Sequence, residues 1–376
     1  MSAGTIVGLV IGLGCLVAGA EFLVKGAAAI ATRLGVQPVV IGLTVVAFGT
    51  SAPELAVSVA SSISGNSDVA FGNVAGSNIA NILLILGASA VVGGLAVSQR
   101  IVRIDVPLLV GVSIVALLMS LDNRIGRVDG VLLFSGVIAY TWWLIRASRR
   151  ETAAVSQEYA VAIESVEGAV GERPILVQIS LVVGGLVVLV IGSQLLVNSA
   201  TDIAESLGVS DLVIGLTVVA IGTSLPELAT SILAAFRGQR DIAVGNVVGS
   251  CLFNLMCVLG LTGIVSPDGV NVGDSSLRLD FPVMIAATIV LVPIMWNGFQ
   301  IKRWEGLVLT AFYAAYLAYL VLAEGDSAAA DVVAPAVLLA APLVMMTFAV
   351  TGYQGWRRYT RSPGVSPAGD GPAVHR

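Results

Sequence analysis

The sequence predicts an all-α membrane protein built from two inverted five-helix repeats, a ten-helix core, plus an eleventh transmembrane helix near the C-terminus. Three observations predict this class: the composition is apolar, the apolar residues form helix-length runs, and one half of the chain repeats the other. Of the 376 residues, 57% are hydrophobic and only 11% are charged. A soluble domain carries about 25% charged residues. So few charges cannot cover a globular surface, and lipid is therefore the expected solvent.

Eleven apolar runs are long enough to cross a bilayer as helices, which takes ~20 residues each. The runs cover residues 5–24, 38–63, 70–92, 105–121, 129–146, 175–199, 212–236, 243–264, 281–297, 305–322 and 332–351. Gly, Pro, Asn, Asp and charged residues fill the gaps between them, as is typical of loops.

The distribution of Lys and Arg predicts the orientation, because cytoplasmic loops carry an excess of these residues. With the N-terminus outside, 16 of the 19 Lys and Arg residues fall on the cytoplasmic side. Only Arg124, Arg127 and Arg278 fall outside. The prediction is a multi-pass protein of the cell (inner) membrane, with its central linker and its C-terminus in the cytoplasm.

These spans divide the chain into five parts. Residues 1–146 form the first repeat, 147–174 a polar cytoplasmic linker, and 175–322 the second repeat. Residues 323–361 hold the extra helix, and the tail 362–376 is expected to be disordered because it is rich in Pro and Gly.

The two halves of the chain are nearly identical in sequence in two places. IGLTVVAFGTSAPEL at 41–55 returns as IGLTVVAIGTSLPEL at 214–228, and GNVAGSNIAN at 72–81 returns as GNVVGSCLFN at 245–254. Both pairs share an offset of 173, and from Gly42 to Gly87 the two copies agree at 25 of 46 positions. Each unit holds five helices, an odd number, so the second unit is expected to enter the membrane from the opposite side. Transporters with this design place their sites near the midplane, on interrupted helices.

Glu54 and Glu227 lie inside apolar runs at matching positions of the two repeats. An acidic residue at the centre of a membrane helix costs roughly 2.5–3.5 kcal/mol on insertion scales, so two of them indicate a function. Each ends a Gly-Thr-Ser-x-Pro-Glu motif. The proline removes a backbone hydrogen bond, so we expect each helix to open there and to free carbonyl oxygens. The carbonyls concerned are those near Ala47, Thr50, Ala220 and Thr223.

Hydroxyl and amide side chains surround each carboxylate at helical spacing. They are Thr50, Ser51, Ser58, Ser77 and Asn81 in the first repeat, and Thr223, Ser224, Ser231, Ser250 and Asn254 in the second. The three cysteines lack metal-ligand spacing, and the only histidine is His375 in the tail. An all-oxygen, anionic site suits calcium, which takes ~6–8 oxygen ligands, whereas zinc or copper favours His and Cys. Alternatives stay open: protonated carboxyls bonded to hydroxyls, and amides that only join helices.

Other acidic residues have simpler interpretations. Asp105 and Asp280 precede prolines at helix starts, which favours a role as N-caps. Glu21 has no acidic counterpart, because the matching residue is Gln194, and it is a candidate for an access path.

At the repeated motifs the sequence resembles the cation/calcium exchanger superfamily. GTSAPEL with GNVAGSNIAN, and GTSLPEL with GNVVGSCLFN, are similar to that family's two alpha repeats, and the likeness covers most of residues 5–322. Within the family the chain resembles the short prokaryotic sodium/calcium exchangers. It differs from the proton/calcium branch, which carries an acidic residue soon after Gly-Asn in the third helix; here Val-Ala-Gly-Ser follows Gly72-Asn73.

The resemblance implies that helices 2, 3, 7 and 8 form the ion sites and that helices 1 and 6 slide as the gate. It implies that Glu54 and Glu227 are shared ligands of calcium and sodium. It assigns backbone oxygens to Thr50, Thr223, Ala47 and Ala220, and completes the sodium sites with Ser51, Ser224, Ser77, Ser250, Asn81 and Asn254. Some members carry Asp where this chain has Asn254, and the potassium-dependent branch is known for Asp in this region; the ion stoichiometry stays open.

The expected function is therefore secondary active exchange of calcium for sodium by alternating access, with the ions competing for one midplane site. A proton-coupled antiporter of calcium or another divalent cation is the alternative, and a channel is a third reading. An enzyme is not expected, since no histidine lies in a membrane segment to serve a serine nucleophile. No cofactor and no nucleic acid partner are expected, and the mechanism requires no oligomer.

Overall fold

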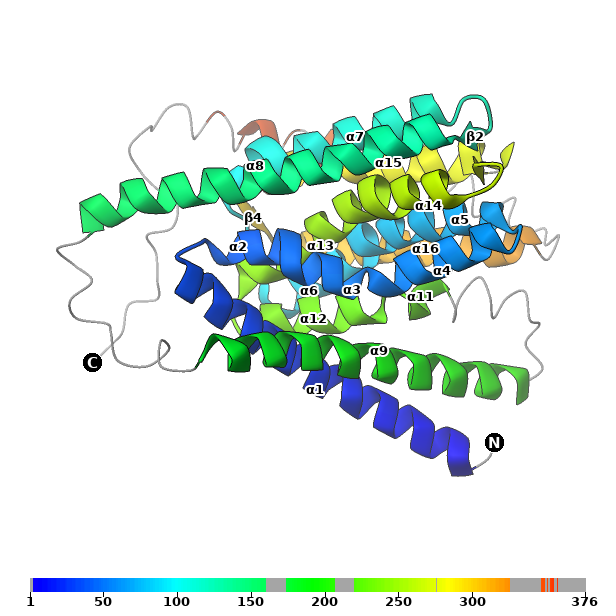
Figure 1. The fold of residues 1–376 in the computed structure, drawn as a ribbon, viewed down its shortest axis with the longest axis horizontal. Coiled ribbons are helices and arrows are strands. Elements are labelled where there is room, and N and C mark those ends of the chain that lie inside the picture. Colours follow the sequence, from blue (N-terminus) through cyan, green and yellow to red (C-terminus); the bar gives the residue numbers. More distant parts are fainter. Residues whose placement is uncertain are drawn as a thin grey trace.

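The computed structural model describes residues 3–159, 174–206, 220–274, 276–324, 346–348, 350, 352–354 and 357. Eight helices in these ranges are long and apolar enough to cross a membrane, and a ninth span consists of two helices joined at a 43° bend. The chain is thus a mostly helical, multi-pass membrane protein. Its long helices lie side by side, apart from α1 and α9, which cross each other along one edge of the bundle (Figure 1).

The elements of the first half are α1 (Ala3–Leu34), α2 (Pro38–Ile41), η1 (Gly42–Val46), α3 (Ala47–Thr50), α4 (Ala52–Ile63), α5 (Ser67–Ile79), η2 (Ala80–Leu86), α6 (Gly87–Gly93), β1 (Leu95–Ala96), η3 (Ile101–Asp105), α7 (Val106–Met119), β2 (Arg124–Ile125) and α8 (Arg127–Tyr159). Those of the second half are α9 (Ile175–Ser206), α11 (Ala220–Gly222), α12 (Leu225–Phe236), α13 (Arg240–Phe253), η6 (Asn254–Val258), α14 (Leu259–Val265), β3 (Val270–Asn271), η7 (Ser276–Asp280), α15 (Phe281–Trp296), β4 (Gln300–Ile301) and α16 (Arg303–Glu324). The η segments are single stretches of π-helix within longer helices.

Two helices extend well beyond their predicted ends. α1 continues from residue 24 to Leu34, and α8 continues from residue 146 to Tyr159, so the first part of the predicted linker 147–174 is helical. Hydropathy detects only the apolar part of a helix, whereas Lys, Glu, Arg and Ala are good helix formers in water. Most of the predicted eleventh helix 332–351, the N-terminal part of the run 212–236 and the tail 362–376 lie outside the described residues.

The centre of the bundle is formed by matching helices of the two halves. In the most apolar stretch of residues 67–93, 78% of the residues are buried inside the protein, and in that of residues 240–265 the buried fraction is 89%. The buried fraction is only 28% in each of α1 and α9. Polar side chains on α5 and α13 are therefore shielded from lipid by the other helices.

Short strands join the loops of the two halves at opposite ends of the bundle. β1 pairs antiparallel with β4, and β2 pairs antiparallel with β3. The labels of β4 and β2 lie at opposite ends of the long helices (Figure 1). The loops that follow α6 and α15 therefore share one end, and the loops that follow α7 and α14 share the other.

The capping role predicted for Asp105 and Asp280 is wrong. Both residues have helical backbone angles, continue from a π-helix into the next α-helix, and make no capping hydrogen bond. Their carboxylates instead accept hydrogen bonds from Tyr140 Oη (3.0 Å) and Tyr316 Oη (2.9 Å). The π-turn lets the helix continue into the first-turn proline. The tyrosine hydrogen bonds then link the start of α7 to α8 and the start of α15 to α16.

Glycines bring α1 and α9 into backbone contact. A Cβ atom at Gly12 would lie 2.9 Å from Gly192 O, and one at Gly19 would lie 2.8 Å from Gly185 O. The order of these pairs makes the two helices antiparallel. Gly12 matches Gly185 and Gly19 matches Gly192 at the repeat offset, so the two contacts are equivalent.

We expect Gly185→Ala to lower the melting temperature of the purified protein, because its Cβ would lie 2.7 Å from Leu23 N and 2.8 Å from Gly19 O. Overpacking of this kind costs roughly 1–3 kcal/mol. The neighbouring Gly184→Ala is the control, since a Cβ there meets nothing within 4 Å. Equal melting temperatures for the two variants in detergent would contradict the close contact.

Candidate functional site

A break in the helix positions each of the two buried glutamates. Ser51 interrupts the span between α3 and α4, and Ser224 occupies the matching place before α12. A proline follows within the first two residues of each new helix, and Glu54 and Glu227 lie in its first turn. Both glutamates are completely buried. The Gly-Thr-Ser-x-Pro-Glu motif therefore produces a helix start inside the protein, as predicted.

Each carboxylate is held by a serine from the other half of the chain. Ser51 Oγ donates to Glu227 Oε1 at 2.9 Å, and Ser224 Oγ donates to Glu54 Oε1 at 3.2 Å. Ser224 Oγ also lies 3.3 Å from Ser77 Oγ on α5. Five predicted site residues from the two helix breaks, α4, α5 and α12 are thereby brought together, and neither half alone can form this arrangement.

Two asparagines that the sequence analysis did not select brace the helix breaks. Thr50 Oγ1 donates to Asn246 Oδ1 at 3.2 Å, and Asn246 Nδ2 donates to Ser231 Oγ at 2.9 Å.

The matching bonds of the other half run from Thr223 Oγ1 to Asn73 Oδ1 (3.5 Å) and from Asn73 Nδ2 to Ser58 Oγ (3.0 Å). The signal was present: both asparagines belong to the repeated Gly-Asn-Val motif and lie one helical turn before Ser77 and Ser250.

The main chain at the first break is more fully bonded than expected. Ala47 O accepts from Ser51 N at 3.0 Å and from Thr50 Oγ1 at 3.4 Å, so the break does not free this carbonyl in the conformation observed. The bond forms because the helix turns once more before it opens. In the second half, Ser224 N donates to Ile221 O at 3.0 Å instead, a tighter turn that does not engage Ala220 O.

Several buried polar atoms of the site have no hydrogen-bond partner among the residues that the structure describes. They are Glu54 Oε2, Glu227 Oε2, Asn81 Oδ1, Asn81 Nδ2, Asn254 Oδ1 and Ser250 Oγ. Most buried polar atoms in proteins are paired, so such a set needs an explanation. Five of the six atoms are oxygens. Within the described ranges no Lys or Arg forms a salt bridge with either glutamate. The chemistry of these atoms fits a bound cation.

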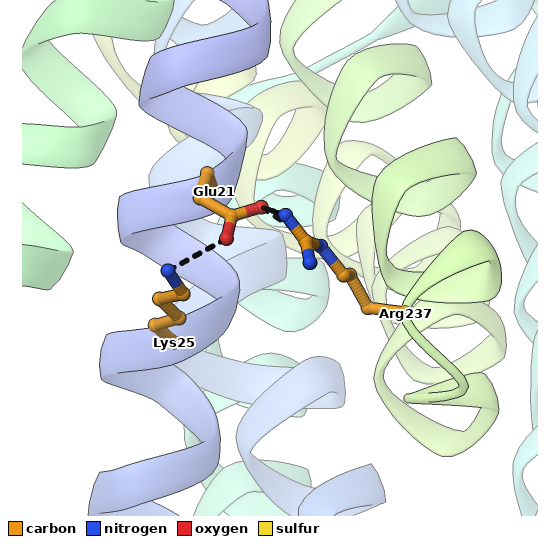
Figure 2. A network of polar contacts seen from close by, with 3 residues as sticks. All are labelled: Glu21, Lys25 and Arg237. Carbon is orange, nitrogen blue, oxygen red and sulfur yellow. Dashed lines mark hydrogen bonds and ion pairs between the residues drawn. The ribbon is translucent and has the colours of Figure 1, made fainter.

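Glu21 lies on α1 and forms an ion-pair network with Lys25 and Arg237 (Figure 2). Its Oε1 lies 2.7 Å from Lys25 Nζ, and its Oε2 lies 2.8 Å from Arg237 Nη2. Arg237 directly follows α12, so the network joins α1 to the end of the helix that carries Glu227. An open groove of about 660 Å³ runs beside it, lined by Val10, Leu13, Gly14, Val17, Ala18, Glu21, Phe22 and Arg237.

Comparisons with known proteins agree with this geometry. The family model for the sodium/calcium exchanger protein matches residues 4–146 and 177–322. The sodium/calcium exchanger MaX1 of Methanosarcina acetivorans is 36% identical over 346 residues, covering 83% of this chain and 97% of the relative. The inner membrane protein YrbG of Escherichia coli is 34% identical over 317 residues, covering 83% and 95%.

A solved structure of the sodium-calcium exchanger NCX_Mj, soaked with zero Na⁺ and Ca²⁺, superposes with a TM-score of 0.72 at 28% identity. The match covers 85% of this chain and 100% of that one. The fold and the comparisons together define a membrane antiporter of the exchanger type. The chain belongs to the sodium/calcium exchanger protein family, a family of transporters rather than enzymes.

Asn73→Ala and Asn246→Ala should destabilise the protein to a similar degree, because each change removes the two hydrogen bonds that the asparagine amide makes to a threonine and a serine hydroxyl. The expected loss is roughly 1–3 kcal/mol, seen as a lower melting temperature in detergent. Asn66→Ala is the matched control, since Asn66 is exposed and makes no capping bond. A control that lost as much stability as the Asn73 and Asn246 variants would refute the bracing role.

Proposed function

We propose that this chain exchanges calcium for sodium across the membrane, with both ions competing for a site built on Glu54 and Glu227. The observation that carries the proposal is the pair of fully buried carboxylates, each with an unpaired oxygen atom and no Lys or Arg salt bridge among the described residues. The names of relatives such as MaX1 support the choice of ions.

The physical basis is charge compensation. Two carboxylates in a low-dielectric interior carry a large desolvation cost unless a cation is bound. One calcium ion or several sodium ions can supply the charge, but the site cannot hold both sets at once. Switching access from one side of the membrane to the other with an empty, doubly negative site would be costly. Only ion-loaded states therefore switch, and transport becomes exchange.

The ligand roles follow the two repeats. Glu54 and Glu227 serve calcium and sodium in turn, and the backbone oxygens of Thr50, Thr223, Ala47 and Ala220 assist them. The sodium sites are completed by side chains that lie buried at the two helix breaks and on α5, η2, α13 and η6: Ser51, Ser77, Asn81, Ser224, Ser250 and Asn254. Ala47 O is bonded within its own helix in this conformation, so its use requires the turn before Ser51 to loosen.

Inverted repeats and alternating access complete the proposal. Support comes from bonds that recur at matching positions, such as Ser51 to Glu227 and Ser224 to Glu54. The strand pairs β1–β4 and β2–β3 support opposite orientations, because the equivalent strands β1 and β3 belong to different pairs and lie at opposite ends, as do β2 and β4. In this arrangement residues 1–146 and 175–322 are the two repeats, and α1 and α9 move together as the gate.

The orientation proposed for the chain places the N-terminus outside and the C-terminus in the cytoplasm of the cell (inner) membrane. Arg100, Arg103, Arg237, Arg240 and Lys302 then face the cytoplasm. The ion-pair network of Glu21 lies on that side. An eleventh helix within 323–361 and a disordered tail at 362–376 belong to the same proposal.

Radiolabelled calcium uptake into sodium-loaded proteoliposomes tests the function, with external sodium replaced by choline. We expect uptake that depends on the outward sodium gradient and falls to background in Glu54→Gln and Glu227→Gln, because each change removes one of the two charges that bind the ion. Glu205→Gln is the matched control at an exposed position of α9 and should transport normally.

Uptake driven by a proton gradient without sodium would instead indicate proton-coupled antiport of calcium or another divalent cation. Flux without any counter-ion would indicate a channel. Normal uptake in either glutamate variant would refute the proposed site.

The Glu21–Arg237 pair is expected to influence the exchange rate, since α1 must move past α12 if it is part of the gate. An ion pair at a partly exposed position is worth ~0.2–1 kcal/mol, so losing it should change turnover by about fivefold at most. Glu21→Gln and Arg237→Gln should have the same effect, and the double variant should add nothing further.

Arg240→Gln provides the control, because it removes an exposed arginine three residues further along the chain. Additive effects of the two single changes on the initial rate of exchange would show that the residues act separately.

A further inference from the structure

We propose that Asn78 is a positioning residue that makes Asn254 present its amide oxygen, rather than its amide nitrogen, to the transported cation. Asn78 is fully buried on α5, and Asn254 is fully buried at the start of η6. The proposal deepens the function proposed above and rests on it, because it assigns Asn254 to the cation site.

The orientation of Asn78 is determined by its own neighbours. Its Nδ2 donates to Cys251 O at 3.3 Å and approaches Met284 Sδ at 3.7 Å. A carbonyl oxygen and a thioether sulfur can accept hydrogen bonds but cannot donate them. The amide of Asn78 therefore cannot turn over without losing both contacts, and its Oδ1 must point the other way.

The fixed Oδ1 of Asn78 in turn determines the orientation of Asn254. Asn254 Nδ2 donates to Asn78 Oδ1 at 3.3 Å. A reversed Asn254 would place two oxygen atoms against each other, so the reversed rotamer is disfavoured. Asn254 Oδ1 is left buried and has no hydrogen-bond partner in the described part of the chain. An unpaired oxygen in this position is available to a cation, whereas an NH₂ group would repel one.

Comparison of the two repeats shows that only one half orients its amide in this way. Asn78 and Cys251 occupy matching positions at the offset of 173, and Cys251 Sγ lies 3.9 Å from Asn78 O. Neither oxygen nor nitrogen of the Asn81 amide, the counterpart of Asn254, has a partner among the described residues. A thiol at position 251 does not orient an amide as Asn78 does. The two matching amides are therefore unequal: Asn254 is oriented in advance, and Asn81 is not.

Asn254 depends on a neighbour for its orientation because its side-chain amide ends in an oxygen on one side and an NH₂ group on the other. An aspartate at position 254 would present an oxygen in either orientation, so it would not depend on residue 78. This difference separates a positioning role from simple packing, since a packing defect at residue 78 would persist whatever residue stands at 254.

The experiment compares wild-type protein with Asn78→Ala, Asn254→Asp and the double variant, all as the full chain in detergent. The apparent sodium affinity is measured from the rise in melting temperature with sodium chloride, with choline chloride at equal ionic strength as the control. We expect Asn78→Ala to raise the half-maximal sodium concentration about tenfold, equivalent to ~1.4 kcal/mol. In the Asn254→Asp background the same change should shift it less than twofold.

An equal shift in both backgrounds, or no shift in the wild-type background, would overturn the proposal. If Asn78→Ala does not fold, Asn78→Ser makes the same comparison with a smaller loss of volume. Sodium-driven calcium uptake is measured in parallel with wild-type vesicles. The expected pattern of sodium affinities without any such uptake would leave the positioning role intact and reject the exchange function. Uptake combined with equal shifts would reject the positioning role alone.

Discussion

The burial of two carboxylates, without a basic partner among the described residues, is the constraint on which the rest of the structure depends. A single acidic group in such an interior can be neutralised by a proton, but a matched pair beside unpaired amide and hydroxyl oxygens is suited to a mobile cation. The broken helices follow from this constraint, because they bring serine hydroxyls to Glu54 and Glu227. So does the deep burial of α5 and α13, which keeps water and lipid from competing for the same oxygens.

Asn73 and Asn246 show how the site remains rigid although its helices are broken. A helix end inside a membrane leaves polar groups that lipid cannot satisfy. Each asparagine connects the threonine before one break to a serine beyond the other, so the two breaks hold each other in place. The carboxylates are thereby positioned by side chains that are separate from the oxygens left for the ion.

Much of this could be read from the sequence, and the failures have physical causes. Hydropathy located the spans, and the prolines located the break before Glu54 and Glu227, because both signals act along a single helix. The continuation of α8 to Tyr159 was missed because a helix does not end where it leaves lipid. The cap predicted at Asp105 was wrong, and Asn73 was overlooked. In both cases the partner, Tyr140 or Thr223, lies far away along the chain, and spacing within one helix cannot supply it.

The crossed bonds also limit what a shorter ancestor of this protein could have been. A chain with only one half would leave Glu54 without Ser224, Thr50 without Asn246, and β1 without β4. All of these contacts would be restored at once if two identical copies met around a twofold axis. A gene for one half could therefore have encoded a working homodimer before duplication and fusion. Only after duplication could the two copies differ, as they now do at Asn78 and the matching Cys251.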